Sequence, residues 1–235
     1  MSVKTKRSLG TKLLRFVPLR SARSNAAKKT IAHFAESLGL VYFGYVDQHA
    51  DEHELVRGFT LSMDHRDNHY CVGSVNGYDV ILVERTDEIS FPDKPGQRFE
   101  WLILQIDLRS HDYPHAFFSS VRHSDTYYSN LFIKYARFQK LDLRLWTGHD
   151  PAFTQEFSIF AAPEANYELG RLFTPDITVA MAHHFKGLEF ELAQDKLYVY
   201  ANNQSVTPAL LDRITKNGLW LASQLDAARA LRDQP

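Results

Sequence analysis

The chain has 235 residues, 27 basic and 28 acidic side chains, and a formal net charge of −1. With 44% hydrophobic and 23% charged residues, its composition is that of an ordinary globular protein, which excludes a disordered, collagen-like or disulfide-based chain. Its single cysteine, Cys71, excludes an internal disulfide and a multi-cysteine metal site. The longest apolar stretches, 40–46 and 101–106, are far shorter than the roughly 18–20 residues that cross a bilayer, so no transmembrane segment is expected.

Charge is divided unequally along the chain. Residues 1–35 contain nine basic and no acidic residues, so the remainder carries a net charge of −10. We therefore expect a basic N-terminal tail over residues 1–23 and a single α+β domain over residues 24–235. This asymmetry predicts that the tail contacts an anionic membrane surface or an acidic protein partner. The basic residues expected to make that contact are Lys4, Lys6, Arg7, Lys12, Arg15, Arg20 and Arg23.

Spacing within the tail indicates a short amphipathic helix that ends at Pro18. Its apolar residues lie on one helical face and are Leu9, Leu13, Phe16 and Val17. Such a basic amphipathic segment is typical of contact with anionic lipid. It is not a secretory signal, because no uninterrupted apolar region follows the charges, but its acid-free composition is also that of an organelle transit peptide. A solvated N-terminus and nucleic-acid contact through the tail are the alternatives.

A better-formed helix is predicted over residues 24–38. Ser24 is a candidate N-cap and Gly39 fits the position after the helix. Its apolar stripe consists of Ala27, Ile31, Phe34, Ala35 and Leu38. This stripe predicts a helix that packs on the body.

Strand patterns follow in the next part of the chain. Residues 40–46 and 59–63 are two candidates, and residues 70–85 form a predicted hairpin. Asn76-Gly77 lies between its two apolar runs, which favours a type I′ turn because both positions need positive φ. Residues 97–108 are apolar on both faces and predict a central strand. The stretch 86–96 holds Pro92, Pro95 and Gly96 and is expected to be a loop.

The second half of the chain contains both helix-like and strand-like spacings of apolar residues. Helices are expected at 126–140, 165–173, 178–185 and from Pro208 onward, and strands at 115–121, 153–161, 188–192 and 197–201. Thr207 can cap the last helix, and Gly218 inside it predicts close packing there. Consecutive hairpins with helices gathered between them predict an α+β fold, mainly an antiparallel sheet with segregated helices and a C-terminal helix.

Catalytic signatures are missing from the sequence. There is no nucleophile elbow, dinucleotide fingerprint, phosphate loop or zinc-protease motif. Cys71 lies within a predicted strand, which favours a buried structural thiol over a nucleophile. The aromatic residues of 127–138 repeat at helical spacing, which favours core packing over a base-stacking platform.

Eleven histidines include pairs spaced four apart, a spacing that could place two imidazoles on one metal ion. The candidate ligands are His49, His53, His65 and His69, with acidic residues between 47 and 54 as further ligands. They define an alternative function, a metal-dependent hydrolase using His, Asp and Glu of residues 47–69. Surface or satisfied histidines are the favoured interpretation, and no cofactor is expected.

Two stretches resemble a known group of proteins. The first is the glycine-flanked hairpin at 73–80 followed by the apolar strand at 101–108. The second is the strand at 157–161, the Thr174-Pro175 helix start, and the paired runs at 188–191 and 197–200. Together they resemble a group of uncharacterised bacterial α+β proteins that are often found beside membrane segments. The resemblance implies one α+β body and supplies no catalytic residues.

These observations favour a non-enzymatic binding or scaffolding module with peripheral membrane contact through the basic N-terminus. A cytoplasmic, membrane-peripheral location is expected. The metal-dependent hydrolase and nucleic-acid contact through the tail are the alternatives.

Overall fold

The computed structural model describes residues 18–44, 56, 58, 59, 61, 65–91 and 94–232. The amphipathic segment predicted at residues 9–17, the basic residues from Lys4 to Arg15, and the candidate ligands His49 and His53 lie outside the described residues.

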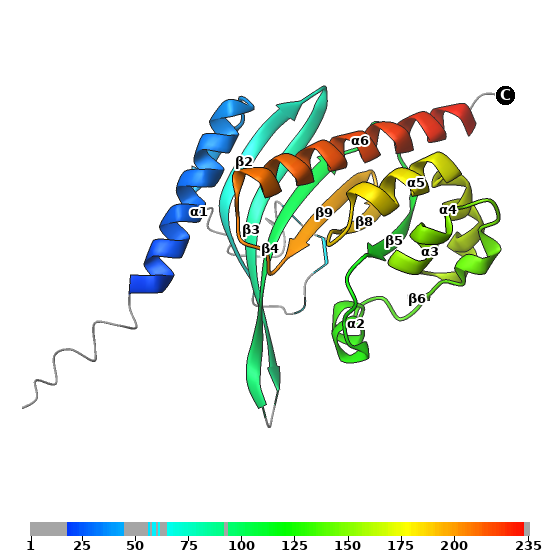
Figure 1. The fold of residues 1–235 in the computed structure, drawn as a ribbon, viewed down its shortest axis with the longest axis horizontal. Coiled ribbons are helices and arrows are strands. Elements are labelled where there is room, and N and C mark those ends of the chain that lie inside the picture. The colour runs from blue at the N-terminus through cyan, green and yellow to red at the C-terminus, as the bar shows by residue number, and fades with distance from the viewer. Residues whose placement is uncertain are drawn as a thin grey trace, which may run out of the picture.

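One sheet of nine strands organises the fold, in the order β1-β2-β3-β4-β9-β8-β5-β7-β6, with every neighbouring pair antiparallel (Figure 1). The strands are β1 (Val41–Gly44), β2 (Arg66–Val75), β3 (Tyr78–Phe91), β4 (Lys94–Asp107), β5 (Tyr113–Ser119), β6 (Gln139–Lys140), β7 (Ser158–Ala161), β8 (Glu189–Gln194) and β9 (Lys196–Asn202). The predicted α+β class with a mainly antiparallel sheet is confirmed.

Six α-helices accompany the sheet within the described residues. They are α1 (Pro18–Ser37), α2 (Asp125–Leu131), α3 (Pro151–Glu156), α4 (Asn166–Leu172), α5 (Pro175–His184) and α6 (Pro208–Arg232). Figure 1 shows α1 at one end of the sheet and α2, α3 and α4 toward the other, with α6 crossing one face.

The two faces of the sheet have separate cores. Apolar residues of α1, α3, α4, α5 and α6 pack on one face, against strand residues such as Leu104, Phe190 and Val199. The opposite face is covered by α2, Phe132 and the described residues of 56–61, which pack on Trp101, Phe117 and Tyr200. This second core also contains the aromatic residues of 127–138, so the core-packing interpretation of that segment is confirmed.

Local predictions succeed where the chemistry is specific. Asn76 and Gly77 have φ of 53° and 76° and join β2 to β3 as the predicted type I′ turn. Residues 101–106 of β4 are all buried, as expected of a central strand. Gly39 follows α1 with φ of 72°, the conformation that favours glycine after a helix.

The start of α1 differs from the prediction. The helix begins at Pro18 rather than at residue 24, because proline already has the φ of a first helical turn. The expected boundary between residues 23 and 24 therefore falls inside a helix.

The prediction of a loop over residues 86–96 is wrong. β3 continues to Phe91 and β4 starts at Lys94, and the two strands stay paired as a hairpin that extends from the body (Figure 1). Pro95 lies close to the start of β4, where a missing N–H disrupts little of the ladder.

The secondary structure predicted for two aromatic segments is also wrong in part. The helix predicted over 126–140 ends at Leu131, and turns closed by the N–H groups of Tyr135 and Phe138 continue the three-residue spacing. The strand predicted over 153–161 begins only at Ser158. Before it lies α3, because the Asp150 carboxylate accepts a hydrogen bond from Ala152 N and Pro151 occupies the first turn.

Gly218 of α6 lies where the helix touches the sheet most closely. A Cβ atom there would lie 3.0 Å from Ile106 Cδ1 and 3.2 Å from both Leu104 Cδ2 and Val199 Cγ2. The close packing predicted from the sequence is therefore present.

We expect Gly218→Val to lower the free energy of unfolding by about 1–3 kcal/mol, because the added methyl groups overpack this contact. Urea denaturation measures the change. Ala227→Val is the matched control, since it adds the same side chain at an exposed position of α6 and should cost less than about 1 kcal/mol. Equal losses in the two variants would contradict the packing argument.

Candidate functional site

The sheet face under α2 carries an unusual number of buried charges. Asp67, Asp87, Glu189, Glu191 and Arg85 are all buried there. Glu189 and Glu191 alternate with residues of the helix-covered core, and Arg85 and Asp87 continue the phase of Val83 in the opposite core. Asp67 lies directly across from Arg85 in β2, so all five project toward the same side. Burial of a charge is costly unless it is paired or hydrogen-bonded, so each group needs a partner.

Arg85 and Asp67 form a fully buried ion pair. Arg85 Nε donates to Asp67 Oδ1 and Arg85 Nη2 to Asp67 Oδ2, both at 2.7 Å. Nη2 also donates to the carbonyl oxygen of Val56 at 2.6 Å. Burial opposes the charged guanidinium, but the hydrogen bonds and charge of Asp67 outweigh it and raise the pKa of Arg85. Arg85 therefore stays charged, and its hydrogen bond to Val56 holds the covering segment there.

Glu191 and Asp87 hold the backbone of the same covering segment. Glu191 Oε2 accepts from Phe59 N at 3.0 Å and from Tyr200 Oη at 2.6 Å, and Glu191 Oε1 contacts His115 Nε2 at 2.7 Å. The Asp87 carboxylate accepts from the N–H of Leu61. The Phe59 ring lies among the rings of His115, Phe117, Phe132, Tyr135 and Phe138.

Glu189 joins the end of β5 to the segment before α2. Its Oε1 accepts from Ser119 Oγ at 2.7 Å and contacts His123 Nε2 at 3.0 Å. The His123 ring stacks on Tyr127 with centroids 3.8 Å apart. Because the imidazole nitrogen faces the carboxylate and not the hydroxyl, His123 is not placed to accept the Ser119 proton, as a nucleophilic triad would require.

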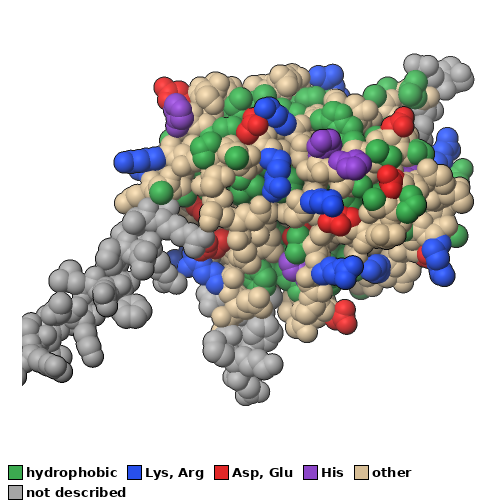
Figure 2. All heavy atoms as spheres, in the orientation of Figure 1, with side chains coloured by type: hydrophobic (Ala, Val, Ile, Leu, Met, Phe, Trp, Pro, Cys, Tyr) green, Lys and Arg blue, Asp and Glu red, His purple; other side chains and the backbone are tan. Residues whose placement is uncertain are grey.

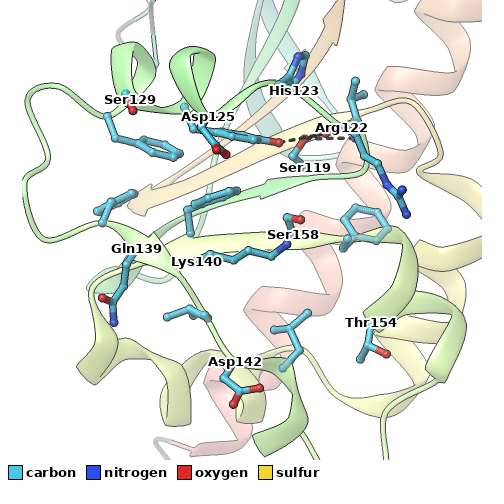
Figure 3. Close-up of a pocket in the computed structure, with 18 of the residues that line it drawn as sticks. Ser119, Arg122, His123, Asp125, Ser129, Gln139, Lys140, Asp142, Thr154 and Ser158 are labelled. Carbon is cyan, nitrogen blue, oxygen red and sulfur yellow. Dashed lines mark hydrogen bonds between the residues drawn. The ribbon is translucent and has the colours of Figure 1, made fainter.

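A groove opens beside this cluster, at the end of the sheet formed by β5, β7 and β6 (Figure 3). Its volume is about 1070 Å³. Aromatic side chains of Tyr128, Phe132, Phe138 and Phe160 form much of its lining. Figure 3 shows Lys140 beside Ser158 in the middle of the groove, with Ser119 and His123 on the α2 side and Asp142 and Thr154 on the opposite side.

The charges along the groove are mixed. Arg144 is held by Asp142, with Nη2 to Oδ2 at 2.7 Å. Arg122 and Lys140 have no ion-pair partner within the part of the chain that the structure describes. Chemically, the groove offers an aromatic surface with basic and hydroxyl groups along it, which suits binding of a ligand with apolar and polar parts.

Of the four predicted metal ligands, His65 and His69 are among the described residues. His69 lies in β2 with φ of 59°, its Nδ1 2.8 Å from Tyr42 Oη and its Nε2 3.5 Å from Glu84. Burial, and then the nearby Lys28 charge, lower the pKa of His69. Asp67 is the acidic residue nearest to His69 along the chain, and its carboxylate is already bound by Arg85. Among the described residues, which include His65 and His69, no group of three His, Cys, Asp or Glu side chains could hold a metal ion.

The basic N-terminal region continues into α1. Arg20 and Arg23 lie in its first turns, and Lys28 and Lys29 are exposed. Ala27, Ile31 and Ala35 are buried on the other side of the helix and anchor it to the body. Figure 2 shows basic and acidic side chains interspersed over the α6 face, without a large patch of one sign.

Sequence reasoning missed the buried charge cluster. A usable signal was present, since Glu189 and Glu191 alternate with apolar residues in a predicted strand. Charged residues at alternate positions of a strand that is buried on both faces indicate an internal polar network. None of the described helices is long and apolar enough to cross a membrane.

Comparisons with known proteins give a fold likeness only. No family model matches the chain, and no curated protein matches it. Among solved structures it is similar to the crystal structure of the mycobacterial trehalose monomycolate transport factor A, TtfA, with a TM-score of 0.55 over 86% of this chain and 93% of that chain. The two sequences are 8% identical, so the likeness shows a shared α+β fold alone.

We expect Arg85→Met to lower the free energy of unfolding by about 3–5 kcal/mol, because it leaves the Asp67 carboxylate buried without its charge partner. The double variant Arg85→Met/Asp67→Leu should recover a large part of this loss, since no charge then remains unpaired. Urea denaturation measures both. Arg98→Met, which breaks the exposed pair with Glu100, is the control and should cost at most about 1 kcal/mol. A double variant no more stable than Arg85→Met would contradict the explanation.

We also expect the Cys71 thiol to be inert in the native protein. Its side chain is fully buried, and burial raises its pKa to about 12, so the reactive thiolate is scarce at neutral pH. A disulfide reagent such as DTNB at pH 8 should react with urea-unfolded protein and leave native protein unmodified over the same period. Stoichiometric labelling of the native chain would show that the strand opens readily.

Proposed function

We propose that the protein is a non-enzymatic binding or scaffolding module that attaches peripherally to an anionic membrane surface through its basic N-terminal region. One observation carries this proposal: the acid-free basic segment continues into a helix, α1, whose apolar side is fixed to the body while Lys28 and Lys29 are exposed. A membrane contact made through α1 would therefore be rigidly coupled to the domain behind the helix.

Charge separation supports this orientation. The chain after residue 35 carries a net charge of −10, so an anionic surface repels it and attracts the N-terminal region. The same separation disfavours nucleic acid as a partner, because the body would repel the phosphate backbone.

The groove lined by Tyr128, Phe160 and Lys140 is the ligand site of this proposed module. Support for binding over catalysis comes from Ser119 and His123, which both contact one Glu189 oxygen, so the hydroxyl lacks the histidine base of a nucleophilic triad. TtfA, a protein of similar fold, is named as a transport factor. A cytoplasmic, membrane-peripheral location, and kinship with the uncharacterised bacterial α+β proteins, belong to the same proposal.

Sedimentation of the full chain with lipid vesicles tests the membrane contact. We expect binding to vesicles of phosphatidylcholine with phosphatidylglycerol and little binding to phosphatidylcholine alone, with a decrease as salt is raised. Reversing Arg20, Arg23, Lys28 and Lys29 to Glu should weaken binding by roughly two orders of magnitude or more, because each basic residue near the surface contributes about 1 kcal/mol.

A matched variant separates local contact from net charge. Reversing Arg66, Lys134, Lys186 and Lys216 to Glu changes the total charge equally at exposed positions outside α1 and should affect binding much less. Equal affinity for both vesicle types, or equal losses in the two variants, would reject the proposal.

A further inference from the structure

A second hollow lies apart from the groove, between residues 145–149 and α4. Its volume is about 580 Å³, within the range of small-molecule sites. Its principal lining residues are Leu145, Trp146, His149, Asn166, Tyr167 and Arg171, and we call it the Tyr167 hollow. It shares no lining residue with the groove.

The wall formed by Trp146 is held rigidly. Trp146 Nε1 donates to Asn166 Oδ1 at 2.7 Å, and the indole ring stacks with Phe153 and Phe173 behind it. Gly170 allows α4 to approach, because a Cβ there would lie 3.3 Å from Trp146 Cδ1 and Nε1. The indole is therefore positioned before any ligand arrives, which reduces the entropy lost on binding.

Two large apolar side chains at this hollow face solvent. Leu145 is 70% exposed and Tyr167 is 76% exposed, although Trp146 beside them is buried. Exposed apolar side chains gathered at one concavity are typical of a binding site rather than of a random surface.

Polar groups of both signs surround these rings. Arg171 lies over the Tyr167 ring, with Cζ 5.8 Å from the ring centroid, and Glu164 lines the same hollow. The Asn166 oxygen is used by Trp146, whereas no described residue accepts a hydrogen bond from its amide nitrogen. Glu164 also forms an ion pair with Arg137, so its charge is already compensated, and the guanidinium of Arg171 disfavours a cationic ligand.

We propose that the Tyr167 hollow binds a neutral carbohydrate. A sugar ring has an apolar C–H face, which packs on the π-face of Tyr167, and a rim of hydroxyl groups that both donate and accept hydrogen bonds. Asn166, Arg171 and Glu164 supply planar donors and acceptors for such hydroxyl pairs. A purely apolar ligand would leave these polar groups desolvated without partners, which costs affinity. This proposal does not depend on the membrane contact.

Titration of the full chain with cellobiose, maltose and N,N′-diacetylchitobiose tests the proposal, with saturation-transfer NMR and tryptophan fluorescence as readouts. We expect saturable binding of at least one of these disaccharides and a fluorescence change from Trp146. Tyr167→Ala should weaken binding about tenfold or more, because the stacking face is lost. Tyr167→Phe keeps the ring and should bind within about threefold of the native chain.

Val179→Ala, at an exposed position of α5 away from the hollow, is the matched control and should bind as the native chain does. Unchanged unfolding curves for all three variants show that the differences come from the hollow. Absence of saturable binding for all three disaccharides, or equal binding by Tyr167→Ala and the native chain, would overturn the proposal. Binding of benzyl alcohol at the hollow without any sugar binding would also overturn it, since the site would then select an aromatic group.

Discussion

The burial of carboxylates on one face of the sheet is the constraint on which the covering of that face depends. Asp67, Asp87 and Glu191 lie under a segment whose backbone they and Arg85 hold in place. Because an unpaired buried carboxylate would be strongly destabilising, the position of Val56, Phe59 and Leu61 is specified by charge as well as by shape. Glycine at position 58 is part of the same arrangement, because a Cβ atom there would lie 2.5 Å from Tyr200 Oη.

This arrangement makes the two faces of the sheet physically different. The helix-covered face is largely apolar, with Leu104, Phe190 and Val199 against α5 and α6. Hydrogen bonds also hold this layer, since Asp226 of α6 accepts from Tyr78 Oη and Tyr113 Oη. On the other face hydrogen bonds to charged groups hold α2 and the residues of 56–61. The groove opens where this polar cover ends, beside Ser119 and His123, so its basic and hydroxyl groups continue the internal network to the surface.

Much of the fold could be predicted from the sequence because several signals were local. The Asn76-Gly77 turn, the two-sided strand at 101–106 and the Gly218 contact each follow from the chemistry of one or two residues. The predicted type of secondary structure was wrong where one pattern fits two structures. The aromatic spacing of 132–138, for example, suits turns as well as a helix. The site was missed because it joins strands distant in sequence. Glu189 reaches Ser119, 70 positions away, and no spacing reveals that contact.

The strand order places the proposed membrane contact and the proposed ligand site at opposite ends of the sheet. α1 packs on β1 and β2, whereas the groove lies at β5, β7 and β6, seven strand spacings from β1 to β7. At about 4.8 Å for each spacing, this separates the two by roughly 34 Å along the sheet. A membrane bound through α1 would therefore leave the groove open to a ligand or partner. Continuous pairing through β4 and β9 would also keep the two ends in a fixed relation, as a scaffolding role requires.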